Sequence, residues 1–157
     1  MFAEILTNLD ISVKKCSELS GIPQSTLADL AKGKTSIEKM SAGNVKKLSK
    51  CFKKSMEEMM DYCVLPEISD VDEFKKAEDE KIKEKGLSGY IAELDGANLI
   101  ETCYDLNDRV RFEKYMSSLC ALYSENDNNI PPKYSSLIFK YKNNVSSDIK
   151  NMLKFLA

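Results

Sequence analysis

The sequence contains no histidine and no tryptophan, and only two of its 23 basic residues are arginines. Without histidine, the chain can form neither a Ser-His or Cys-His catalytic pair nor the H-E-x-x-H helix of zinc proteases. A Ser-Lys dyad is compatible with the composition, but the sequence has neither a strand-rich segment to hold one nor a glycine-rich phosphate loop. We therefore expect no enzymatic activity and no cofactor.

Long apolar runs are also missing, since no stretch of about 18 consecutive apolar residues could span a membrane. The first residues lack the basic start, the apolar block and the small-residue cleavage site of a secretory signal. Apolar residues make up 43% of the 157 positions and charged residues 31%, which is typical of one or two small folded domains. We expect a soluble, cytoplasmic protein.

The five cysteines are odd in number and widely spaced, and none of them forms a C-x-x-C pair. They are Cys16, Cys51, Cys63, Cys103 and Cys120. This spacing, together with the absence of histidine, argues against a zinc site or a disulfide framework. Because most of the cysteines stand beside apolar residues at helical spacing, we predict buried thiols.

The charges are unevenly distributed along the chain. Residues 1–56 contain ten lysines and five acidic residues, whereas residues 67–157 contain 13 basic and 17 acidic residues. A basic first part followed by an acidic second part indicates that only the first part meets a polyanion. Runs of lysine also occur on ordinary solvated surfaces, so charge alone leaves the partner open.

Apolar residues at helical spacing predict five short helices in the first third of the chain. Ser12 and Ser55 are N-cap candidates for the second and fifth helices. Gly21 should end the second helix, and Pro23 should start the third, where its missing N–H costs nothing. The predicted inward positions are Phe2, Ile5, Leu6 and Leu9; Val13, Cys16 and Leu19; Leu27 and Leu30; Ala42, Val45, Leu48, Cys51 and Phe52; and Met56, Met59 and Met60.

The rest of the chain also reads as helical, which predicts an all-α protein with two domains. We place the first domain at 1–65, a linker at 66–72 and a helical domain with a smaller core at 73–157. Gly96 should interrupt or bend the helical run. The predicted apolar faces are Leu87, Tyr90, Ile91 and Leu94; Leu99, Ile100 and Cys103; Phe112, Tyr115, Met116, Leu119, Cys120 and Tyr123; Tyr134, Leu137, Ile138 and Tyr141; and Val145, Ile149, Met152, Leu153 and Leu156.

Two features of the second domain have alternative interpretations. The charged segment from Glu73 to Glu84 is either a solvated helix face or a surface that mimics nucleic acid or binds a basic partner. The apolar face from Phe112 to Tyr123 is either the core of the domain or a groove for a partner or a second copy. The sequence favours the ordinary interpretation in both cases.

The stretch SGIPQSTLADLAKGKT, at residues 20–35, predicts two helices joined by a tight glycine-containing turn. In a helix-turn-helix motif the second helix enters the DNA major groove with its N-terminal residues at the base edges. An ordinary helical hairpin, in which the polar residues only cap and solvate the helix, is the alternative.

Four residues should lie on the outward face of that second helix. Gln24 can pair with adenine, Ser25 can donate or accept, and Thr26 can offer its methyl group to thymine. Asp29 could accept from cytosine or orient a neighbouring side chain. These four are the candidate base-reading residues.

The segment from Ile5 to Met60 resembles the helix-turn-helix domain of the Cro/repressor family, also called the xenobiotic-response-element (XRE) family. The matching features are S-x-x-x-x-S-x-x-SGIPQSTLADLAKGKT from Ser12, followed by SAGNVKKLSKCF and SMEEMMDY. The resemblance covers roughly the first 40% of the chain and implies a five-helix fold, a homodimer and a palindromic double-stranded DNA operator.

Carried over by position, the resemblance also places the groove-facing residues at Gln24, Ser25, Thr26 and Asp29. It implies DNA backbone contacts near four further residues, which are Ser12, Lys32, Lys34 and Thr35. The sequence departs from the family at Cys16, where a larger aliphatic residue is common. It also lacks an arginine in the third helix, which argues against a guanine-rich target.

The segment ANLIETCYDLNDRVRFEKYMSSLCALYSENDNNIP is similar to the helical C-terminal regions of uncharacterised XRE-type proteins of low-GC bacteria, some of which look like antitoxins or regulators of mobile elements. The leading hypothesis is a sequence-specific transcriptional repressor that acts on its own promoter. The alternative is an antitoxin or phage counter-defence inhibitor that binds a protein partner through the C-terminal helical domain.

Overall fold

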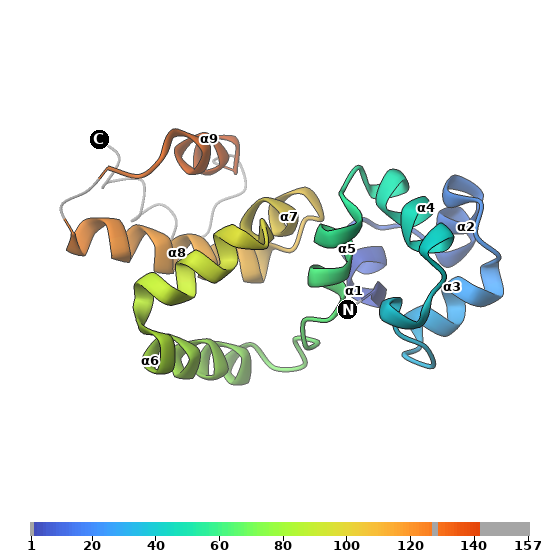
Figure 1. The fold of residues 1–157 in the computed structure, drawn as a ribbon, viewed down its shortest axis with the longest axis horizontal. Helices are drawn as coiled ribbons and strands as arrows, with labels where there is room; N and C mark the ends of the chain where they lie inside the picture. The colour runs from blue at the N-terminus through green and yellow to red at the C-terminus, as the bar shows by residue number, and fades with distance from the viewer. Residues whose placement is uncertain (1, 127–128, 142–157) are drawn as a thin grey trace. The chain divides into compact units, whose positions relative to one another are not determined.

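The computed structural model describes residues 2–126 and 129–141, and every regular element within those ranges is helical (Figure 1). The elements are α1 (Phe2–Asn8), α2 (Val13–Ser20), α3 (Gln24–Ala31), the 3₁₀ helix η1 (Ile37–Lys39), α4 (Ala42–Phe52), α5 (Met56–Cys63), α6 (Val71–Gly96), α7 (Leu99–Asp105), α8 (Arg109–Glu125) and α9 (Pro132–Tyr141). The all-α prediction is confirmed for these residues. The last predicted apolar face, from Val145 to Leu156, lies outside them.

The chain forms two compact units that are not continuous in sequence. The first unit contains the residues up to Ile68 together with Ala97–Asp108, and the second contains Ser69–Gly96 and the residues from Arg109 onward. The sequence analysis divided the chain once, at 66–72. The structure therefore adds one element, α7, to the first unit, because α7 packs on α5.

The core of the first unit comes from the predicted apolar stripes of α1 to α5. Leu27 and Leu48 are fully buried, as expected. Leu19, however, is 56% exposed, and Ala42 is exposed as well, so both were wrongly predicted to face inward. Because helix residues are about 100° apart, Val13, Cys16 and the two serines of α2 form the inward stripe, and Leu19 lies about 100° from its centre.

Two local predictions for the ends of these helices have different outcomes. Ser55 caps α5 through a capping box, in which its side chain accepts from the backbone N–H of Glu58 and the Glu58 carboxylate accepts from the N–H of Ser55. Pro23, in contrast, occupies the N-cap of α3 rather than its first turn, and the helix begins at Gln24. Its extended ψ of 136° lies outside the helical region.

A buried polar contact and a surface amide hold α7 and its flanks in the first unit. The Tyr62 hydroxyl of α5 donates to the Asp108 carboxylate at 2.7 Å, and both residues are buried. The Asn107 side-chain amide donates to the backbone carbonyl of Asn8 at 2.8 Å. Asn98 precedes α7 and donates to the carboxylate of Glu58. These contacts link the segment to both α1 and α5.

In the second unit, α6 changes direction at Gly86, whose φ of 72° and ψ of 158° are not helical. The predicted boundary between a charged segment ending at Lys85 and an apolar helix starting near Leu87 is therefore confirmed. α6 ends at Gly96, as the sequence indicated. The segment after the kink carries three of the buried residues that α8 helps to cover, which are Tyr90, Ile91 and Leu94.

The apolar face of α8 belongs to the core of the second unit. Its buried residues are Phe112, Tyr115, Met116, Leu119 and Cys120, whereas Tyr123 is only partly buried. The rings of Tyr90 and Tyr115 meet edge to face, with centroids 6.2 Å apart. The interpretation as a core is thus confirmed for the buried members of this face.

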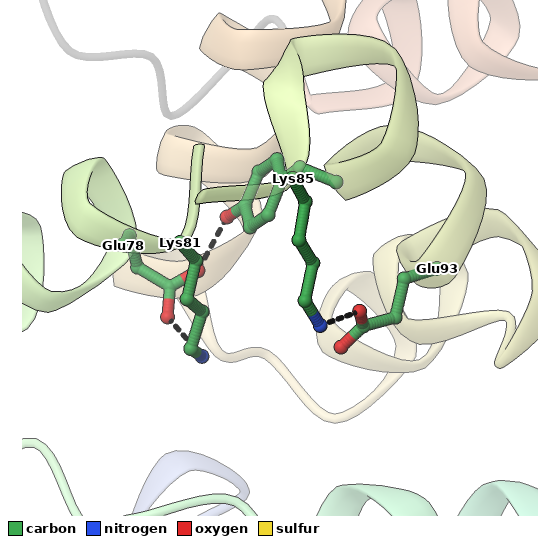
Figure 2. Close-up of polar contacts among 5 residues, drawn as sticks. Glu78, Lys81, Lys85 and Glu93 are labelled. Atoms are coloured by element: carbon green, nitrogen blue, oxygen red, sulfur yellow. Dashed lines mark hydrogen bonds and ion pairs between the residues drawn. The ribbon is translucent and has the colours of Figure 1, made fainter. Parts of the chain in front are cut away.

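The charged first half of α6 is mostly exposed, but Glu78 is an exception with only 2% of its surface exposed. Its carboxylate accepts from the Tyr90 hydroxyl across the Gly86 kink and pairs with Lys81 at 2.7 Å (Figure 2). Burial, followed by this bond to a carboxylate, raises the pKa of Tyr90. Glu78 therefore joins the two halves of α6 instead of contributing to a solvated face.

Candidate nucleic-acid interface

The turn between α2 and α3 depends on one left-handed residue. Gly21 has φ 68° and ψ 26° and donates its N–H to the carbonyl of Ser17, which ends α2. A side chain is strained in this conformation, so glycine is the residue that allows the chain to turn at once into α3. Ser12 caps the other end of α2 by accepting from the Lys15 N–H at 3.1 Å.

Two serine hydroxyls hold the turn from the side of α2. Ser17 Oγ donates to the carbonyl of Ile22 at 2.6 Å, and Ser20 Oγ donates to the carbonyl of Cys16 at 2.7 Å. The N–H of Ile22 donates back to Ser20 Oγ at 3.3 Å, and the Ile22 side chain is 1% exposed. Sequence analysis included both serines in the family pattern but assigned them no role; their spacing of five and two residues before Ile22 was the available signal.

A further hydrogen bond to the turn comes from α4, and the sequence pattern did not predict it. The Lys47 ammonium donates to the backbone carbonyl of Gly21 at 3.2 Å, across 26 positions in the sequence. Lys47 is exposed, and one of its three N–H donors is engaged in this bond. The turn is therefore fixed relative to α4 as well as to α2.

The four candidate base-reading residues all belong to α3 but differ in their exposure. Gln24, Ser25 and Asp29 are exposed, whereas Thr26 is partly buried. On the other side of the helix, Leu27 and Leu30 face the core, with 0% and 6% exposure. Ser25 and Asp29 are one helical turn apart and share a face, and Gln24 is the first residue of the helix.

The candidate backbone-contact residues fall into two places. Lys32, Lys34 and Thr35 follow α3 in the loop around Gly33, whose φ is 68°, and Ser12 lies apart from them at the start of α2. The loop folds back on the helix end, since the Lys34 N–H donates to the carbonyl of Asp29 at 2.9 Å.

The structure brings one residue of each candidate set together. The Lys34 ammonium and the Asp29 carboxylate are 3.8 Å apart, and both side chains are more than half exposed. An exposed pair of this kind contributes about 0–1 kcal/mol and exchanges readily with solvent. Asp29 thus lies beside the Lys34 side chain, which is the arrangement expected if Asp29 orients a neighbouring side chain.

The basic residues of the first unit all precede α5, in a part of the chain that also contains five acidic residues. The basic residues of this unit are the ten lysines of residues 1–56, whereas every charged residue in α5 and α7 is acidic. One of those acids, Asp105, forms an ion pair with Lys54, whose side chain is only 7% exposed. The lysines available to a polyanion therefore belong to α2, α4 and the loop after α3.

The cysteines are free thiols, and three of them, Cys16, Cys103 and Cys120, are buried. Burial raises the pKa of Cys16 to about 11, and a thiol contact with Cys51 adds to this. Burial also raises the pKa of the Cys120 thiol to about 11, so Cys16 and Cys120 are protonated at neutral pH and are poor nucleophiles and metal ligands. No cluster of three potential ligands occurs among residues 2–126 and 129–141.

No protein-family model matches this chain, and no curated protein or solved structure is significantly similar to it. Within the described part of the chain, no helix combines the length and the apolar character needed to cross a bilayer.

Proposed function

We propose that the protein is a sequence-specific DNA-binding transcriptional regulator of the helix-turn-helix type, in which α3 reads bases in the major groove. One observation carries the proposal: α2 and α3 are joined through a left-handed Gly21 that serine hydroxyls and Lys47 hold in place. This turn leaves Gln24 and Ser25 exposed at the N-terminal end of α3. That is the end of the recognition helix that meets base edges in such motifs.

Each exposed residue of α3 has a distinct role in this proposal. Gln24 presents an amide that can bind adenine N6 and N7 as a bidentate pair, and Ser25 can bind any base edge. Thr26 is partly buried, which suits a methyl contact to thymine rather than a polar one. Asp29 orients Lys34 toward a phosphate, because the two side chains already form a pair.

The phosphate contacts come from the two ends of the motif. Lys32 and Lys34 follow α3, and Ser12 lies at the N-terminus of α2, where backbone N–H groups attract anions. With about six phosphate contacts in a dimer, log K against log salt should have a slope near −5.

Each chain has one such motif, so a palindromic operator requires two copies. We propose a homodimer that represses its own promoter, and the upstream region of its own gene is the first operator to test.

The test is fluorescence anisotropy with the upstream region of the gene and with random DNA of equal length. Gln24→Ala should weaken binding to the specific site about 5- to 150-fold, which corresponds to about 1–3 kcal/mol, and should leave random DNA almost unchanged. Lys34→Ala should weaken both DNAs alike and lower the salt slope by about one. Lys76→Ala, an exposed lysine of the second unit, is the matched control. Unchanged specific binding by a correctly folded Gln24→Ala variant would remove the base-reading role.

A second candidate function is an inhibitor that binds a protein partner through the second unit, as an antitoxin or counter-defence protein does. The observation that favours it is a set of exposed apolar side chains there: Val71 at 43%, Val110 at 38% and Phe139 at 55%. Co-expression with the product of the adjacent gene tests it. A complex that Phe139→Ser disrupts and Gln24→Ala does not would support this function.

A further inference from the structure

A pocket of about 390 Å³ opens in the first unit beside the loop that follows α3. Its apolar lining residues are Phe2 of α1, Leu30 of α3 and Ile37 of η1, which also belong to the core of the unit. Val64, at the end of α5, completes the wall and is 53% exposed. The volume falls in the range of small-molecule sites, and the exposed valine is apolar surface that a ligand could cover.

The other wall of the pocket is the polar loop 33–39. The lining residues of this loop include the lysines Lys34 and Lys39, the hydroxyl-bearing residues Thr35 and Ser36, and the acidic residue Glu38. Lys39 is exposed and has no ion-pair partner among the described residues. With two lysines and one acidic residue, the loop that borders the pocket has a net positive charge, and two of its residues carry hydroxyl donors.

We infer that this pocket binds a small organic anion with an apolar body, such as an aromatic or branched carboxylate. The apolar body would lie against Leu30, Ile37 and Val64, and the carboxylate would face Lys39 and the hydroxyl of Ser36. Cys63 also borders the pocket, and burial raises the pKa of its thiol to about 12. It stays neutral and so does not repel an anion.

The consequence for regulation depends on the proposed function. Lys34 borders the pocket and is also a candidate phosphate contact, and its pairing with Asp29 at 3.8 Å is exposed and weak. A carboxylate bound beside Lys39 places a negative charge on the same loop as Lys34 and so weakens the attraction of the Lys34 ammonium for DNA phosphate. The ligand would therefore act as an inducer that lowers operator affinity by weakening one phosphate contact in each copy of the motif.

The direct test uses 2-naphthoate as the probe and its neutral isostere 2-naphthamide as the charge control, with ¹⁵N chemical-shift mapping on the full chain without DNA. We expect 2-naphthoate to shift the amides of residues 33–39 and of Val64, with a dissociation constant of about 1 mM, since a ligand of its size binds weakly in an open site. The amide should bind at least threefold more weakly, because it cannot pair with Lys39.

Matched variants separate the pocket from general surface binding. Val64→Asp should abolish the shifts, whereas Val71→Asp, which changes a similarly exposed valine in the second unit, should leave them unchanged. Lys39→Ala should weaken 2-naphthoate about threefold and 2-naphthamide not at all. Equal affinity for the two probes, shifts scattered over other elements, or no shift at 5 mM would overturn the assignment.

A second measurement distinguishes failure of this inference from failure of the proposed function. Saturating 2-naphthoate should weaken operator binding by about threefold to tenfold at low salt, and Lys39→Ala should blunt that effect. If 2-naphthoate shifts the amides of residues 33–39 but does not change operator affinity, the inducer role is refuted and the ligand site stands. Absence of any operator binding would refute the proposed function, and the shift mapping would still decide the ligand site.

Discussion

The buried bond between Tyr62 and Asp108 is the sharpest test of how α7 is held in the first unit. We consider the change Tyr62→Phe, which removes one hydroxyl and preserves the ring. The hydroxyl is 2.7 Å from the carboxylate, and the residues are 0% and 4% exposed. Hydrogen bonds to charged groups contribute about 1.5–3 kcal/mol, and a buried carboxylate that loses a donor adds desolvation cost. We expect the variant to lose about 2 kcal/mol.

For a chain of this length, a loss of about 2 kcal/mol lowers the melting temperature by about 4–8 °C. Urea denaturation followed by circular dichroism gives the change in the free energy of unfolding. Amide hydrogen exchange then locates it, and protection should fall in α5 and α7 more than in α8. Tyr123→Phe is the control, because its partly buried hydroxyl makes no hydrogen bond within the described residues; it should change stability by less than about 0.5 kcal/mol.

A double-mutant cycle with Asp108→Asn separates the bond itself from the surrounding packing. The cycle should show a coupling energy of about 1–2 kcal/mol, because the two side chains touch. A coupling below about 0.3 kcal/mol, or equal losses for Tyr62→Phe and Tyr123→Phe, would refute the claim that this bond fastens α7 to α5.

Three further predictions concern the glycines, one ion pair and the domain boundary. In the same urea assay, Gly86→Ala should cost about 1–3 kcal/mol of stability, because the φ of 72° at this position is strained for alanine. Gly89→Ala should instead stabilise the helix by up to about 1 kcal/mol, because a Cβ added there meets only an ordinary contact at 3.5 Å. Lys133 holds the pKa of Asp95 below its ordinary value of 3.8. The pair of side chains therefore stabilises the folded state above pH 3.8, and this contribution to the free energy of unfolding is lost as the pH falls through the lowered pKa. In an NMR titration, Lys133→Ala should return the pKa of Asp95 toward 3.8. A fragment of residues 1–72 should melt lower than the full chain and bind an apolar dye, because it lacks α7; a fragment as stable as the whole would contradict the discontinuous unit.

The sequence predicted the helices and the turn between α2 and α3 because their signals are local. The periodic leucines, the caps at Ser12 and Ser55 and the special conformation of Gly21 each depend on residues within a few positions. Leu19 was placed wrongly because a hydrophobic residue at helical spacing fits two neighbouring stripes, and only the packed helices decide between them.

The missed features involve residues that are far apart in the chain. Lys47 reaches Gly21 across 26 positions, and Tyr62 reaches Asp108 across 46. The burial of Glu78 within a charged run also depends on a tyrosine 12 positions away, beyond a kink. A pattern read along one helix cannot indicate such partners, because side chains three or four positions apart are the only neighbours it describes.

Because residues 97–108 belong to the first unit, this unit cannot be completed during synthesis until those residues have been added. Asp108 leaves the ribosome 46 residues after Tyr62, which at about 5–20 residues per second is a delay of about 2–9 s. During that time the nascent chain already contains α1 to α5, while the face of α5 that α7 covers is open to other molecules. The first unit is therefore completed only after the whole of α6, which belongs to the second unit, has been synthesised.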